Sequence, residues 1–182
     1  TVSVSDEKYE DRFKTEIEDG VLKIYYDYKG INWVNDKKKK LKAYLSVKDI
    51  EKIKGSAGAN VSLTNELLAK DLELKFSSGS IFSGKVNVTN LKIDINSGAE
   101  ITASGIAGKF TASASSGAMF KGYELATEFC DVSANSGGAI KIQVQKELKA
   151  SANSGGSIKY TGEASIVKTN TNSGGSVNES NK

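Results

Sequence analysis

Residues 135–142 read NSGGAIKI, residues 153–160 read NSGGSIKY and residues 172–179 read NSGGSVNE. The same turn of asparagine, serine and two glycines therefore recurs after 18 and then 19 residues. In all three copies an apolar residue stands three places after the first glycine. Recurrence at a nearly constant interval is typical of a repeating architecture rather than of a single site.

Related turns extend this repeat towards the amino terminus. The successive spacings of their first glycines are 21, 19, 19, 20, 18 and 19 residues. These glycines are Gly58, Gly79, Gly98, Gly117, Gly137, Gly155 and Gly174. A period of this size predicts a solenoid in which each coil packs mainly on its two neighbours.

The residues on both sides of these glycines alternate between apolar and polar, as in strands that bury one face. Seven places before the glycine the chain has Leu72, Leu91, Phe110, Cys130, Leu148 and Val167. Three places after it the chain has Val61, Phe82, Ile101, Phe120, Ile140, Ile158 and Val177. The pattern predicts one strand before the turn, a second strand after it, and a looser corner marked by Gly84, Gly105, Gly122 and Gly162.

The tight turn itself explains the repeated letters. Glycine accepts positive φ without steric cost, and a short polar side chain before it can bond the backbone. Because coils stack about 4.8 Å apart, identical asparagines would lie within hydrogen-bonding reach of one another. We therefore expect a structural turn ladder made of Asn96, Gly98, Asn135, Gly137, Asn153, Gly155, Asn172 and Gly174.

The predicted fold class is all-β, a right-handed single-stranded parallel β-helix of about six coils. An apolar period of two and the frequent Ser-Gly pairs argue against helices. The chain of 182 residues is predicted to form a single domain, with coils in 51–182 and capping strands in 1–50. Within that cap, EDGVLKIYYDY at 18–28 and KKLKAYLSV at 39–47 are expected to pair, with an earlier tight turn at Asp19-Gly20.

Composition excludes several classes of function. Histidine is absent, which removes the commonest general base and metal ligand, and the single cysteine excludes a disulfide framework. The net charge of +3, with both signs interspersed, argues against a nucleic-acid partner. We expect no catalytic residues, no metal site and no cofactor.

Targeting signals are also missing from the printed sequence. No segment approaches the roughly 18 to 20 apolar residues of a membrane span, and the first residues do not resemble a secretory signal. We expect a mature or trimmed chain that lacks its targeting segment.

Aromatic residues near the amino terminus offer candidate ligand contacts. Trp33, Tyr26 and Tyr28 lie in or beside a polar stretch, and flat aromatic faces are what sugar-binding proteins place against pyranose rings. The alternative is that Trp33 folds over the end of the coil stack, because large aromatic side chains are buried more often than not.

Charged residues on the outward side of the coils are the other candidates. The column Glu73, Lys92, Asp131, Lys149 and Lys168 could line a groove for an acidic polysaccharide, or form a solvated face of unlike charges. Asp94 and Asp131 could be a hydrolytic carboxylate pair, but the register separates them by two coils, about 9.6 Å, and places them in different columns.

Three segments resemble a known family. They are DGVLKIYY at 19–26, IKGSAGANVSL at 53–63 and LKIDINSGAEITASG at 91–105, followed by the NSGG turns. Together they resemble the putative autotransporter adhesin head domain, or head GIN domain, of Gram-negative bacteria, over nearly the whole chain. The resemblance implies a β-helical fold and export to the periplasm, the outer-membrane surface or the extracellular space. It also implies a role in adhesion, and it transfers no binding or catalytic residues.

Three functions follow from these observations. The first is a non-enzymatic, exported surface-interaction module that binds a glycan or a protein. The second is a pectinase-like enzyme that degrades a polysaccharide on the same scaffold, and the third is a structural spacer. A homo-oligomer stays open, because a second copy could cover an end of the solenoid.

Overall fold

The computed structural model describes residues 2–4, 11–27 and 41–180. Its contacts divide the chain into two compact units, Thr1–Lys48 and Asp49–Lys182, and each is described here by itself. All regular elements of the described residues are strands, apart from one short 3₁₀ turn. The all-β prediction is confirmed.

The amino-terminal unit contains two antiparallel strand pairs. Strand β1 (Val2–Val4) pairs with β4 (Leu41–Ala43), and β2 (Phe13–Glu18) pairs with β3 (Val21–Tyr26). The predicted pairing of 18–28 with 39–47 is therefore wrong. The turn at Asp19 and Gly20 has φ values of 50° and 75°, as in the two-residue turns that close hairpins, so β3 pairs with the segment just before it.

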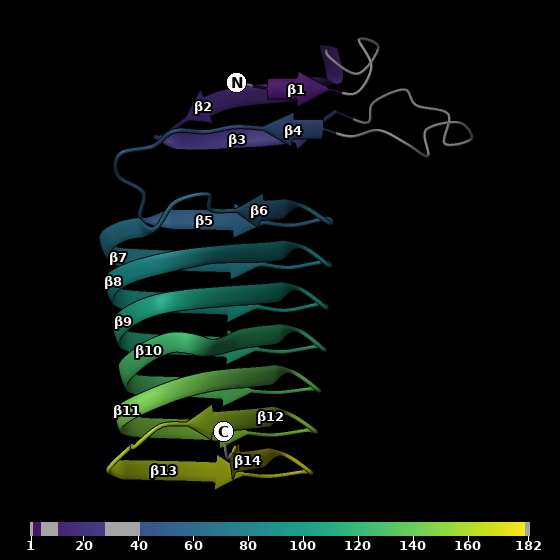
Figure 1. Ribbon diagram of the computed structural model, residues 1–182. Helices are drawn as coiled ribbons and strands as arrows, with labels where there is room; N and C mark the ends of the chain where they lie inside the picture. Colours follow the sequence, from purple (N-terminus) through teal and green to yellow (C-terminus); the bar gives the residue numbers. More distant parts are fainter. Residues whose placement is uncertain (1, 5–10, 28–40, 181–182) are drawn as a thin grey trace. The chain divides into compact units, whose positions relative to one another are not determined.

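The second unit is a parallel β-solenoid of about seven turns with a period near 19 residues (Figure 1). This confirms the predicted fold class, with about one coil more than expected. Every strand pair in it is parallel. Its strands are β5 (Lys52–Gly55), β6 (Asn60–Ser62), β7 (Leu67–Phe76), β8 (Ile81–Ile95), β9 (Glu100–Ala114), β10 (Met119–Ala134), β11 (Ala139–Ala152), β12 (Ser157–Thr161), β13 (Ile166–Thr171) and β14 (Ser176–Glu179).

In the middle coils one strand runs through the looser corner, so the two predicted strands are continuous in β8 to β11. Each coil still presents two faces. We call the face built from 81–84, 100–103, 119–122, 139–142, 157–160 and 176–179 the post-turn face. The face built from 71–76, 90–95, 109–114, 129–134, 147–152 and 166–171 is the pre-turn face.

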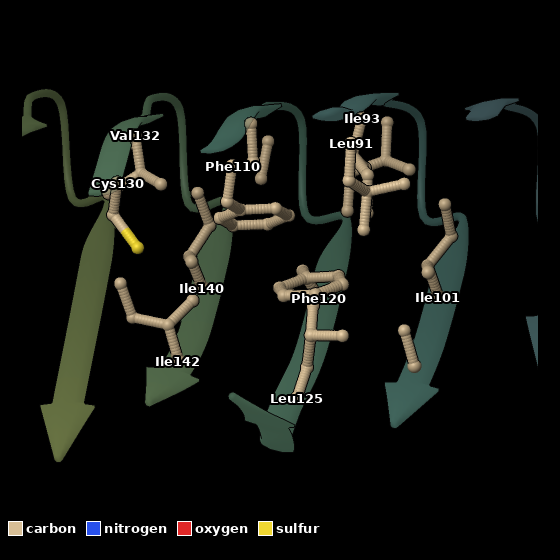
Figure 2. Packing of buried hydrophobic residues seen from close by; sticks show 14 of the residues in the cluster. Leu91, Ile93, Ile101, Phe110, Phe120, Leu125, Cys130, Val132, Ile140 and Ile142 are labelled. Atoms are coloured by element: carbon tan, nitrogen blue, oxygen red, sulfur yellow. The ribbon is translucent and has the colours of Figure 1, made fainter. Parts of the chain in front are cut away.

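The core lies between these two faces, as Figure 2 shows for the middle coils. Phe82, Ile101, Phe120, Ile140 and Ile158 are fully buried on the post-turn side. From the pre-turn side Leu72, Leu91, Phe110, Cys130 and Leu148 meet them, each no more than 3% exposed. The rings of Phe110 and Phe120 stack with centroids 5.0 Å apart. The inward and outward alternation read from the sequence is therefore confirmed in these coils.

The last described coil differs. Val167 is 41% exposed although it is in register with the buried Leu148, and Thr169 and Thr171 are exposed as well. No described strand pairs with the far side of β13. Its inward positions therefore lack the second layer of contacts that buries the other coils.

Each tight corner contains two successive residues with positive φ. In the NSGG turns the serines Ser136, Ser154 and Ser173 have φ of 47° to 48° and the following glycines 73° to 75°. The amide of the residue after the glycine donates to the carbonyl of the asparagine, for example Gly138 to Asn135 at 2.9 Å. These are the features of a type I′ turn.

Hydrogen bonds also link each corner to the next. The backbone amide of Gly137 donates to the carbonyl of Ser154 at 3.1 Å, and the same bond joins every neighbouring pair of corners from Gly58 to Ser173. Among the asparagine side chains, Asn153 Nδ2 donates to Asn135 Oδ1 at 3.2 Å. The corner is thus connected mainly through its backbone.

The second glycine of NSGG has a different role from the first. A Cβ on Gly137 would meet nothing within 4 Å, whereas a Cβ on Gly138 would lie 2.3 Å from the carbonyl oxygen of Ala114. Gly156 and Gly175 are equally close to the carbonyls of Ala134 and Ala152. The first glycine therefore accommodates positive φ, and the second lets the backbone of one coil approach the previous one.

Candidate binding surface

The predicted aromatic site falls mostly outside the described residues. Trp33 and Tyr28 lie there, while Tyr26 is half-buried at the end of β3, opposite Phe13. A sugar site built from these three residues stays a prediction.

The pre-turn face carries a shallow hollow of about 220 Å³. It spans three adjacent coils, and its side chains come from β8, β9 and β10. The outward side chains that line it are Lys92, Asp94, Thr111, Ser113, Asp131 and Ser133. The short side chain of Thr111 stands there between the charged Lys92 and Asp131, and the equally short Ser113 and Ser133 lie beside it.

The strand register fixes how these side chains are arranged. Thr111 pairs with Lys92 on one side and Asp131 on the other, and in the next column Ser113 lies between Asp94 and Ser133. Neighbouring members of a column are about 4.8 Å apart. Hydroxyl donors and carboxylate acceptors are thus gathered on one flat surface of two columns.

An exposed aromatic residue stands on the same face, outside the residues that line the hollow. Phe129 occupies the outward position two residues before Asp131 on β10, and it is 45% exposed. Its partners in the neighbouring coils are Lys109 and Glu147, so it is an aromatic residue in a polar column. The Nζ atom of Lys146 lies 5.4 Å from the centre of its ring and is bonded to Glu128 at 2.8 Å. This cation–π contact holds the ring in place while leaving nearly half of it accessible.

Sequence analysis did not identify Phe129. The signal was present, since the same column has Asp71, Asn90, Lys109 and Glu147 in other coils. Comparing this outward column from coil to coil would have identified Phe129, because it is the aromatic residue in a column that is otherwise polar.

The predicted charged column proves to be partly neutralised. Glu73 accepts hydrogen bonds from Lys52 and Lys75, and it lies 3.6 Å from Lys92. The bond from Lys52, with the nearby Lys75, lowers the pKa of Glu73 from 4.5 to about 2. Lys149 lies 3.6 Å from Glu147 in the neighbouring column of the same strand. The amino-terminal part of this column is therefore a face of paired unlike charges.

The carboxylates of Asp94 and Asp131 occupy different columns, two coils apart, as the sequence register predicted. Asp131 is exposed and Asp94 half-buried. Both carboxylates lie among the lysine and hydroxyl side chains that line the hollow.

Two further observations concern the described residues alone. No three side chains of the metal-binding types Cys, Asp and Glu come together in them as a potential ion site. None of their elements is a helix long and apolar enough to cross a membrane.

Comparison with known proteins gives a consistent result. Residues 2–164 match the family model described as "Putative auto-transporter adhesin, head GIN domain". A search of curated proteins found no significant match.

Solved structures from three bacteria share the fold. A "putative adhesin" from Bacteroides fragilis NCTC 9343 superposes with a TM-score of 0.87 at 16% identity, covering 98% of this chain and 82% of the other. A "putative adhesin" from Parabacteroides merdae ATCC 43184 gives 0.73 at 19% identity, covering 99% and 82%. A "Putative lipid binding protein" from Parabacteroides distasonis ATCC 8503 gives 0.66 at 18% identity, covering 99% and 83%. At these identities the likeness establishes the fold alone.

Proposed function

Since the chain belongs to the family described as "Putative auto-transporter adhesin, head GIN domain", we propose that it is an exported, non-enzymatic surface module that binds a glycan. The family supports an adhesin-like surface role. The choice of a glycan over a protein ligand rests on the chemistry of the pre-turn face.

Phe129 is the observation that carries this proposal. Phe129 is 45% exposed and stands two residues before Asp131, which lines the hollow together with Asp94 and the hydroxyls of Thr111, Ser113 and Ser133. A sugar ring offers an apolar face that stacks on an aromatic ring, and hydroxyls that exchange hydrogen bonds with such groups. A protein interface core would instead be rich in large apolar side chains, which this hollow lacks.

A surface this shallow supports weak binding of each sugar unit. Shallow sites leave most of a ligand in contact with water, so one site contributes little. Many copies on one cell would compensate, because linked binding events raise the total affinity by orders of magnitude. Weak single-site binding is compatible with adhesion between surfaces.

The test is a glycan array probed with multivalent protein. We expect Phe129→Ala to lose most of the signal and Asp131→Asn to lose part of it. Ile106→Ala is the matched control, because Ile106 is also a large apolar residue, 53% exposed, on the same solenoid outside the hollow.

Three results would contradict the proposal. They are an empty array, equal losses in the Phe129 and Ile106 variants, and measurable turnover of any bound polysaccharide. The last result would favour the hydrolase alternative.

Export to the periplasm, the outer-membrane surface or the extracellular space is part of the proposal. The family supports an exported surface protein, and the compartment is to be found by fractionating cells that express the native gene product. Recovery in the cytoplasmic fraction alone would rule export out.

A further inference from the structure

Three lysines stand in one file on the post-turn face, whereas Phe129 and the hollow lie on the pre-turn face. Lys121 on β10 pairs with Lys141 on β11, and Lys141 pairs in turn with Lys159 on β12. Their side chains alternate with the fully buried Phe120, Ile140 and Ile158, so they point outward. We call this set the lysine file.

The file places like charges directly opposite one another. Adjacent strands lie about 4.8 Å apart, and like charges facing each other across strands are destabilising. Lys121 is bonded to Glu100 at 2.7 Å. Within the described residues, Lys141 and Lys159 form no ion pair, and Lys141 has a lysine on each side. The fold thus maintains two uncompensated charges at a small cost in stability.

The lysine file differs from the other lysine-rich column of the solenoid. On the pre-turn face Glu73 lies between Lys52 and Lys92 and binds both. On the post-turn face the residues before and after the file are Thr102 and Asn178, which are neutral hydrogen-bonding residues. On the post-turn face the unpaired Lys141 and Lys159 therefore stand in one line along the axis of the solenoid, whereas in the pre-turn column Lys149, which faces Lys168, lies 3.6 Å from Glu147.

We propose that the lysine file binds a linear acidic polysaccharide aligned with the axis of the solenoid. An extended polymer of acidic sugars carries one carboxylate per sugar unit at regular intervals, and a chain aligned with the axis passes each lysine in turn. Because the lysine side chain is long and flexible, it can reach carboxylates that point to different sides of the polymer. Thr102 and Asn178 extend the line with groups that can bond sugar hydroxyls.

Other polyanions fit this surface less well. A membrane surface is usually bound by clusters of roughly four to eight basic residues, more than the file holds. Single-stranded nucleic acid is held by stacking on aromatic rings. The outward neighbours of Lys141 and Lys159 along their strands are Ala139, Gln143 and Ser157, which offer no ring, and Tyr123, two residues after Lys121, is half-buried.

The experiment measures binding of the full chain to polygalacturonate, with fully methyl-esterified polygalacturonate as the uncharged control. The double variant Lys141→Gln/Lys159→Gln should bind about tenfold more weakly, since each exposed charge pair contributes up to about fivefold. Lys54→Gln/Lys70→Gln removes the same charge from exposed lysines elsewhere and should bind like the wild type. Binding should weaken steeply as salt rises, and the esterified polymer should not bind.

Thermal unfolding separates lost binding from lost structure. The variant Lys141→Gln/Lys159→Gln should melt at or slightly above the wild-type temperature, because the like charges are relieved. Polygalacturonate should raise the melting temperatures of the wild type and of Lys54→Gln/Lys70→Gln equally, and that of Lys141→Gln/Lys159→Gln by less.

Several outcomes would overturn the inference. These are no binding to polygalacturonate, alginate or dextran sulfate, equal losses in both double variants, and a preference for anionic vesicles or single-stranded DNA over the polysaccharides. Phe129→Ala should leave polygalacturonate binding unchanged, so failure here and failure of the glycan proposal are distinguishable.

Discussion

At the scale of the residue, the tight corner depends on three consecutive positions with three different requirements. Ser136 adopts φ of 48°, a region that residues with a side chain seldom enter, and Gly137 follows at 74°. Gly138 lies outside that region, and its backbone approaches the preceding coil. The corners whose fourth residue is alanine or serine have turn hydrogen bonds of 3.1 to 3.2 Å, against 2.9 Å for those with glycine. Turns with a side chain at this position thus have a slightly longer closing hydrogen bond.

One substitution placed at both glycines should therefore have unequal effects. Gly137→Asn should cost less than about 1 kcal/mol, because asparagine tolerates positive φ and nothing crowds its Cβ. Gly138→Asn should cost about 1–3 kcal/mol, because the carbonyl of Ala114 must move. Gly137→Val should also be strongly destabilising, since a β-branched residue resists positive φ. Urea denaturation gives the three values, and a reversed order for the two asparagine variants would contradict the assigned roles.

Sequence reasoning anticipated the first glycine and missed the serine. Glycine signals positive φ directly because no other residue adopts it so readily. Serine carries no such signal, and the structure adds that the carbonyl of Ser136 accepts a hydrogen bond from the amide of Gly117 in the preceding corner, as its equivalents do.

Glu73 gives a pH dependence with a definite sign. Its pKa falls from 4.5 to about 2 in the folded state, mainly through the hydrogen bond from Lys52. A lowered pKa stabilises the fold above pH 4.5, and this contribution is lost as the pH falls through about 2. Because the group is partly exposed, solvent screening makes the contribution modest.

Denaturation of the wild type and of Glu73→Gln at pH 6 and pH 2 tests this. The wild type should lose more free energy of unfolding between the two pH values than the variant does. Other carboxylates titrate in both proteins and cancel in the comparison. Equal losses would mean that Glu73 contributes nothing to stability.

At the scale of the strand, alternate positions have opposite environments. Ile140 is fully buried among the side chains of neighbouring coils, while Lys141 beside it points to solvent. The two residues share one strand and one register, so they differ only in the face that they occupy.

Aspartate substitutions at these two positions should have very different effects on stability. Ile140→Asp should cost more than about 4 kcal/mol and unfold several coils, because an unpaired carboxylate would replace a buried side chain. Lys141→Asp should leave stability unchanged or slightly raised, since it places a negative charge between two lysines. Circular dichroism during thermal unfolding is sufficient, and similar melting temperatures would contradict the assignment.

The columns of the solenoid were predictable from the sequence, while the binding surfaces were not. Apolar alternation and the period of the glycines determine which side chains face the core. Phe129 is unusual only because its neighbours on the adjacent strands are the charged Lys109 and Glu147. Lys141 is unusual only because its neighbours there are Lys121 and Lys159. Those neighbours are 18 to 20 residues away in sequence, so an error of one or two residues in the predicted register would assign different neighbours to each residue.

At the scale of the whole chain, residues 1–50 were predicted to cover the first coil. The structure defines Thr1–Lys48 as a compact unit of its own, and the covering role stays a prediction. In the first coils Ile53, Val61 and Leu63 are only partly buried, unlike their equivalents in the middle of the stack. A solenoid end of this kind needs protection from solvent.

Removing residues 1–48 tests the covering role. We expect faster amide hydrogen exchange in β5 to β7, while β9 to β11 keep their protection, because each coil depends mainly on its neighbours. Mass spectrometry of the exchanged peptides localises the effect. Unchanged exchange throughout residues 49–182 would show that the amino-terminal unit does not protect the solenoid.

The backbone hydrogen bonds that join corner to corner, such as Gly137 to Ser154, also determine how the solenoid would respond to a pulling force. Tension on the carboxyl-terminal end would strip the outermost turn first, while the turns behind it stay wound. Each step would release about 19 residues, or roughly 65 Å of extended chain. In the proposed role as a surface module, the solenoid would lengthen in steps under load and so limit the force on the contacts that it makes.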